Sequence, residues 1–82
     1  MFLHIGGDTS ILSQDLIFIL DLASAGAGDA TKELLEISQR EGLVTNLCPE
    51  EPKSIVITSE QIYLSGISSL TLRGRSRDKF KI

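Results

Sequence analysis

The sequence predicts an α+β domain, a small and mostly antiparallel sheet with one main helix packed on one face. Three observations predict it. Short runs rich in β-branched and aromatic residues are separated by turn residues. Residues 29–41 space their apolar side chains as a helix does. The resulting order, strand-strand-strand-helix-strand-strand, lets the helix cover the sheet from one side.

The first two elements are predicted to be short strands. Residues 1–5 are apolar and end at Gly6-Gly7-Asp8, a sequence typical of a turn. Residues 9–12 then return as a second strand.

Ser13-Gln14-Asp15 admits two interpretations. Ser13 caps a helix, or the three residues turn the chain into a strand at 16–22. We favour the strand, because the apolar run is short, rich in Ile and Phe, and stops at Asp21. Its nearly continuous apolar character predicts that both faces are covered, one by the helix and the other by a neighbouring subunit.

Residues 23–28, Ala-Ser-Ala-Gly-Ala-Gly, are predicted to be a flexible connection to the main helix. Asp29 is expected to be the N-cap of that helix, and Gly42 stands where a C′ glycine ends one. The apolar stripe expected to face the sheet contains Ala30, Leu34, Leu35 and Ile37.

The second half of the chain begins with a further candidate strand at 43–47 and a polar loop at 48–52. Residues 54–58 and 61–65 form a predicted hairpin, and residues 68–72 a short helical turn capped by Ser68. We therefore divide the chain into one domain, residues 1–75, and a basic tail, residues 76–82, which we expect to be flexible.

The chain has 82 residues, which is one domain with a small core. Cys48 is its single cysteine and His4 its single histidine, so an internal disulfide and a Cys/His zinc site are both excluded. A domain with so small a core usually needs a further source of stability, and self-association is the one that remains. We therefore expect a homo-oligomer.

The sequence offers few residues that could act together in catalysis. His4 and Cys48 lie far apart along the chain, and neither has a partner at a spacing that would make a nucleophile–base pair. Gly26-Ala27-Gly28 lacks the phosphate-loop patterns. We therefore predict a protein that is not an enzyme and has no cofactor. The sequence has no membrane-spanning run or signal peptide, which predicts a cytoplasmic location.

The charge is divided along the chain. Residues 1–72 contain ten acidic and three basic side chains, whereas residues 73–82 contain one acidic and five basic ones. Arg73, Arg75, Arg77, Lys79 and Lys81 occupy alternate positions. In an extended chain they would form a one-sided basic stripe able to follow a phosphate backbone. The alternative is a solvated terminus that improves solubility.

Three segments resemble one small bacterial family, the extracellular matrix regulators RemA and RemB, with the greater similarity to the RemB branch. They are residues 2–8 (FLHIGGD), 52–58 (PKSIVIT) and 62–73 (IYLSGISSLTLR). The resemblance covers residues 1 to about 75. It implies a regulator of biofilm matrix genes, in a family whose RemA members bind DNA as ring-shaped homo-oligomers.

The sequence also departs from the pattern of this family at two places. Glu50 and Glu51 stand where RemA members carry paired arginines, and Gly66 stands where RemB members tend to have proline. Lys53 matches a basic position of the family, and Arg73 and Arg75 match its basic C-terminal end.

Two hypotheses follow. The first is a transcriptional regulator whose oligomer binds duplex DNA through candidate contacts on the loop and the tail, namely Lys53, Arg73, Arg75, Arg77 and Lys79. The second is a protein-interaction module of the same fold, whose acidic surface binds another regulatory protein.

Overall fold

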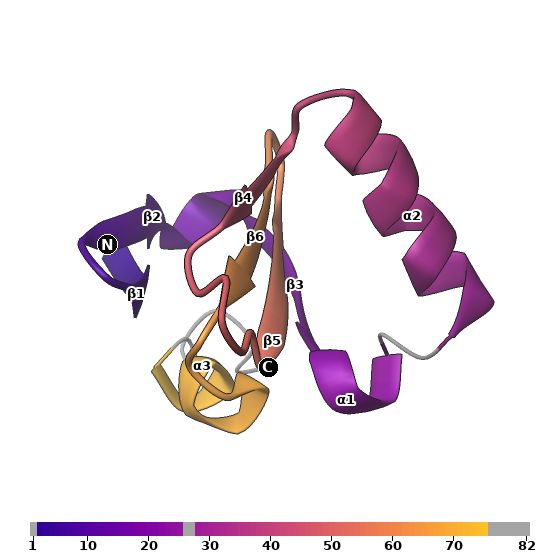
Figure 1. Ribbon diagram of the computed structural model, residues 1–82. Coiled ribbons are helices and arrows are strands. Elements are labelled where there is room, and N and C mark those ends of the chain that lie inside the picture. Colours follow the sequence, from indigo (N-terminus) through magenta and orange to yellow (C-terminus); the bar gives the residue numbers. More distant parts are fainter. Residues whose placement is uncertain (1, 26–27, 76–82) are drawn as a thin grey trace.

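The computed structural model describes residues 2–25 and 28–75. It contains a β-hairpin, a four-stranded sheet and helices on either side of that sheet (Figure 1), which confirms the α+β prediction. The elements are β1 (Phe2–Gly6), β2 (Thr9–Leu12), a 3-10 turn (Ser13–Asp15), β3 (Leu16–Asp21), α1 (Leu22–Ala25), α2 (Asp29–Arg40), β4 (Val44–Asn46), β5 (Ser54–Thr58), β6 (Ile62–Ser65) and α3 (Ser69–Arg75).

Strands β1 and β2 form an antiparallel hairpin that is separate from the main sheet. Gly6 and Gly7 make its turn with φ angles of 138° and 54°, which a residue with a side chain rarely adopts. The 3-10 turn then leads directly into β3, so the interpretation of residues 13–15 as a turn is confirmed.

The main sheet has the strand order β3-β5-β6-β4. The β3–β5 and β5–β6 pairs are antiparallel, as predicted for a mostly antiparallel sheet. Strand β4, the candidate strand after the helix, pairs parallel to β6 at the edge. The connection through α1 and α2 carries the chain from β3 at one edge of the sheet to β4 at the other edge.

The connection predicted at residues 23–28 is partly wrong. Leu22–Ala25 forms the short helix α1, in which the Ser24 hydroxyl donates to Asp21 Oδ2 at 3.0 Å. Alanine is the strongest helix former, so an alanine-rich segment next to a strand end can form a turn of helix despite the glycines that follow.

The main helix is confirmed at Asp29–Arg40, but its start was predicted wrongly. Gly28 is the N-cap, with extended backbone angles, and Asp29 is already helical. Its carboxylate lies in the first turn, near the positive end of the helix dipole. At the other end Gly42, with φ +73°, donates to the Gln39 carbonyl, and Leu43 donates to the Ser38 carbonyl. These two bonds define a Schellman motif.

The two faces of the main sheet are covered unequally. The hairpin and α3 cover one face, and its buried core contains Leu3, Ile5, Ile11, Leu16, Ile19, Val56 and Leu72. Helix α2 lies over the other face (Figure 1), where a second cluster contains Ile55, Ile62 and Leu64. Leu35 of α2 packs against that cluster, whereas Leu34 and Ile37 remain 42% and 44% exposed.

Helix α3 begins where predicted and is longer than predicted. Ser68 Oγ accepts a hydrogen bond from the Thr71 amide at 3.2 Å, as expected of an N-cap. The helix continues through Arg75, and its Leu72 side chain is fully buried in the core under the hairpin.

Candidate nucleic-acid interface

Lys53 lies in the last position before β5, with an exposed side chain and a fixed backbone. Its amide donates to the Ser65 carbonyl at 2.7 Å, and its carbonyl accepts from the Leu22 amide at 3.0 Å. Lys53 and Ser68, the residue that caps α3, line the same shallow hollow. The structure therefore brings this cation close to the beginning of α3.

Arg73 and Arg75 lie on α3 and fold back onto other elements. Arg73 Nη2 donates to the Ile19 carbonyl of β3 at 2.9 Å. Arg75 Nη1 donates to the His4 carbonyl of β1 at 3.1 Å. The extended basic stripe is thus wrong for these two residues, because α3 is helical through Arg75. The cause is Leu72, whose burial under the hairpin holds this turn of the chain as a helix.

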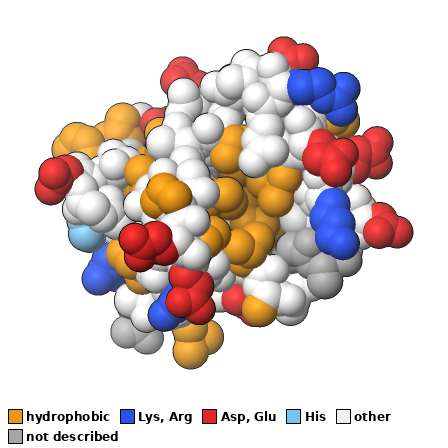
Figure 2. Space-filling model, viewed as in Figure 1, with side chains coloured by type: hydrophobic (Ala, Val, Ile, Leu, Met, Phe, Trp, Pro, Cys, Tyr) orange, Lys and Arg blue, Asp and Glu red, His pale blue; other side chains and the backbone are white. Residues whose placement is uncertain are grey.

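Lys53, Arg73 and Arg75 nevertheless all lie on α3 or close to its beginning, although the two arginines bond carbonyls of different strands. Figure 2 shows basic side chains on the lower left of the molecule, beside the histidine. A guanidinium has five N–H donors, so a bond to one backbone carbonyl does not exhaust the donors of the exposed Arg75. Arg77 and Lys79, the two remaining candidate contacts, lie outside the described residues.

Acidic side chains adjoin these cations. Glu50 and Glu51 are exposed in the loop before β5, and Glu51 lines the same hollow as Lys53. A phosphate approaching Lys53 therefore meets a carboxylate at close range, which offsets part of the attraction. Glu50 and Glu51, which stand where the resemblance implies paired arginines, therefore lie next to a candidate DNA contact.

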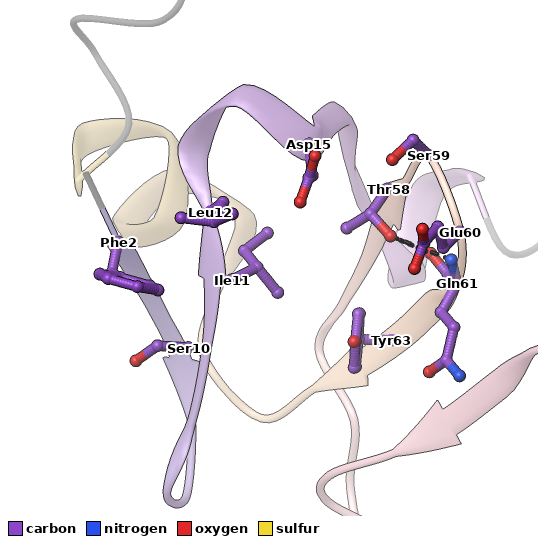
Figure 3. Close-up of a pocket in the computed structure, with 10 residues that line it drawn as sticks. All are labelled: Phe2, Ser10, Ile11, Leu12, Asp15, Thr58, Ser59, Glu60, Gln61 and Tyr63. Carbon is purple, nitrogen blue, oxygen red and sulfur yellow. Dashed lines mark hydrogen bonds between the residues drawn. The ribbon is translucent and has the colours of Figure 1, made fainter.

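A second hollow, which the sequence did not predict, lies between the β1–β2 hairpin and the β5–β6 turn (Figure 3). Its volume is about 310 Å³, and it is lined by Phe2, Ser10, Ile11, Leu12, Asp15, Thr58, Ser59, Glu60, Gln61 and Tyr63. The Thr58 hydroxyl is already engaged, because it donates to the Gln61 carbonyl and accepts from the Gln61 amide. The carboxylates of Asp15 and Glu60 suit a basic group better than a phosphate.

The two residues considered for catalysis lie in different elements and have other partners. His4 Nε2 lies 2.7 Å from the Gly7 carbonyl, and its Nδ1 lies 3.4 Å from Arg75 Nη1, so both ring nitrogens have partners. Cys48 is a free thiol in the loop after β4, where its amide donates to Asn46 Oδ1. Within residues 2–25 and 28–75, no group of three or more metal-ligating side chains comes together.

The helices of the described segments are too short or too polar to cross a membrane.

Comparison with known proteins agrees with the resemblance in the sequence. The sequence model of the RemA-like family, described as extracellular matrix regulatory protein A-like, matches residues 2–75. Extracellular matrix regulatory protein B of Bacillus subtilis (strain 168) is 34% identical over 82 residues, which span 100% of this chain and 98% of that protein. The match includes β1, the β5–β6 hairpin and α3, the three regions in which the resemblance was seen. The chain therefore belongs to the RemA-like family of bacterial extracellular matrix regulatory proteins.

Proposed function

We propose that this protein regulates the transcription of extracellular matrix genes by binding duplex DNA as a homo-oligomer, through the basic surface around α3. Membership of a family of regulatory proteins supports the regulatory part of the proposal. The observation that carries the DNA-binding part is the gathering of Lys53, Arg73 and Arg75 around one short helix on an otherwise acidic domain.

The basic surface is small for a single subunit. Three cations, partly opposed by Glu51, would give weak binding at physiological salt. In a homo-oligomer each subunit adds the same contacts, and engagement of one subunit raises the effective concentration of the next. Arg77, Lys79 and Lys81 follow α3 in the sequence and would add three further positive charges to each subunit.

A second candidate function is an interaction module for another regulatory protein. The exposed carboxylates of Glu50 and Glu51 support it, because they stand where DNA-binding relatives are expected to be basic. In this alternative Arg73 and Arg75 serve the fold, since each already donates to a backbone carbonyl of another element.

Titration of fluorescently labelled duplex DNA at 50 mM and 200 mM salt tests the proposal. The variants compared with the unaltered protein are Arg75→Glu and the triple substitution Arg77→Ser, Lys79→Ser, Lys81→Ser. Lys32→Ser on α2 is the control for the loss of one cation elsewhere in the chain, and light scattering checks that its mass is that of the unaltered protein. We expect both basic-surface variants to weaken binding and to flatten its salt dependence, by about 0.9 in log–log slope for each lost phosphate contact.

Two outcomes would contradict the proposal. Absence of DNA binding by the unaltered protein at 50 mM salt would exclude the DNA-binding function and favour the protein-interaction module. Losses in Lys32→Ser and in the α3 variants that are proportional to the charge removed would mean that net charge, and not this surface, governs binding.

A further inference from the structure

We infer that the sheet face under α2, with the apolar side of α2 itself, is the surface through which two copies of this chain associate. The inference rests on the homo-oligomer of the proposed function and assigns its interface. We call this surface the α2-side face. It comprises Phe18, Leu20, Leu34, Leu35, Ile37, Leu43, Val44, Ile55, Ile57, Ile62 and Leu64.

The strand register shows that the sheet part of this face is continuous. Residues directly opposite each other on neighbouring strands share one face of a sheet. Phe18 is paired with Ile57, Ile57 with Ile62, and Ile62 with Val44, so one apolar row crosses all four strands. A second row runs beside it, from Leu20 through Ile55 to Leu64.

Helix α2 covers only part of these rows. It contacts the sheet at the β4 edge, and at the opposite edge Phe18 of β3 is left 58% exposed. On the helix, Leu34 and Ile37 are more than two-fifths exposed, and so is Leu43 just after it. Figure 2 shows the result as an apolar patch between the sheet and α2.

The exposed area is of the size that an interface uses. Four large side chains that are about half exposed present roughly 400 Å² of apolar surface, given about 200 Å² for each when fully exposed. The largest apolar patch on a typical monomer is about 300–600 Å² and is often functional. A partner that also covered the half-buried residues between them would approach the ~800 Å² per subunit of a stable complex.

The charges beside this face suit a second copy of the chain as the partner. Of the three basic residues within 1–72, Lys32 and Arg40 both lie on α2, together with Glu33 and Glu36. Figure 2 shows side chains of both signs over α2, next to the apolar patch. A surface bordered by one sign of charge would repel its own copy, whereas a mixed border can pair cation with carboxylate across the interface. The mixed border and the apolar centre are both self-complementary.

The other exposed apolar side chains do not form an equivalent surface. Leu70 is 79% exposed on α3, Phe2 is 71% exposed on β1, and Ile17 is 47% exposed at the irregularity of β3. None of the three belongs to the two rows or to α2. Single exposed apolar side chains of this kind are normal on a protein surface.

Light scattering after size exclusion tests the assignment. The samples are the unaltered full chain, Phe18→Lys from the sheet part, Ile37→Lys from the helix part, and Leu70→Lys as the matched control. We expect a multiple of 8.9 kDa for the unaltered chain and for Leu70→Lys. We expect the other two variants to fall to the 8.9 kDa single chain, with the circular dichroism spectrum of a folded α+β protein.

Retention of the unaltered mass by both Phe18→Lys and Ile37→Lys would overturn the interface assignment but leave the proposed function intact. A single chain for the unaltered protein would overturn both the interface and the homo-oligomer. If one lysine variant fails to fold, the polar substitution Ile37→Ser replaces it. Because Ile37 is already 44% exposed, serine there costs the monomer little, so an unchanged mass for Ile37→Ser also counts against the assignment.

Discussion

Arg75 Nη1 lies 3.1 Å from the carbonyl oxygen of His4, and this hydrogen bond joins α3 to β1 across 71 residues of sequence. The same nitrogen faces His4 Nδ1 at 3.4 Å. A residue that was selected from the sequence as a DNA contact therefore also holds two elements of the fold together. The structural role and the DNA-binding role predict different effects of substitutions at Arg75.

Replacement of Arg75 by alanine and by lysine separates these roles. Arg75→Ala should lower the free energy of unfolding by about 0.5–1 kcal/mol, since the hydrogen bond is exposed, and should also weaken DNA binding. Arg75→Lys should lose a similar amount of stability, because lysine lacks the planar fork, but should keep most of the DNA affinity. Urea unfolding and DNA titration are the measurements. An Arg75→Ala protein as stable as the unaltered one would contradict the structural role.

Reversal of the two loop carboxylates should strengthen DNA binding. Glu50→Arg and Glu51→Arg together remove two negative charges beside Lys53 and add two positive ones. We expect the log–log salt slope to steepen by about 1.8, corresponding to two additional phosphate contacts. The matched control is Asp15→Arg with Glu60→Arg, which makes the same change in net charge at the hollow beside the β1–β2 hairpin. Equal gains in both variants would show that the loop has no special position.

Ser65 should be one of the most sensitive polar positions in the chain. Its side chain is fully buried, and its hydroxyl donates to the Ile5 carbonyl and accepts from the Ile67 amide. Ser65→Ala leaves both backbone groups without this partner, and we expect a loss of about 2–4 kcal/mol in the free energy of unfolding. Urea unfolding measures it, with the exposed Ser10→Ala as a control that should change little. A loss below about 0.5 kcal/mol would contradict the role.

Gly66 is predicted to tolerate a side chain poorly because of Cys48. A Cβ atom on Gly66 would lie 3.0 Å from Cys48 Sγ and 3.1 Å from Cys48 Cβ. We expect Gly66→Ala to destabilise the domain by about 1–3 kcal/mol through overpacking. Cys48→Ala should recover part of that loss in the double variant, because it removes the nearer atom. Additive effects in the double-mutant cycle would show that the two positions do not interact.

Much of the fold could be predicted because local patterns determine it. The spacing of Leu34 and Ile37 with Gly42 after them predicted α2, and the turn glycines predicted the β1–β2 hairpin. The role of Ser68 in starting α3 was also visible in the sequence. Each of these signals acts over a few residues.

The features that were missed depend on distant parts of the chain. The helical conformation of Arg73 and Arg75 follows from the packing of Leu72 under a hairpin made of the first residues. The hollow in Figure 3 draws on two segments that are separated by more than forty residues of sequence. The exposure of Phe18 depends on where α2 lies over the sheet, which amphipathic spacing alone does not specify.

The contacts of the hairpin also set an order of events in biosynthesis. Ile5 receives its hydrogen bond from a residue 60 positions later, and Leu3 and Ile5 are buried beside Leu72. The hairpin is therefore synthesised first but gains its partners only when β6 and α3 have left the ribosome. Contacts of such long sequence separation slow folding. Until α3 packs against it, the hairpin's apolar face lacks its partner, and exposed apolar surface of this kind favours aggregation of a partly folded chain.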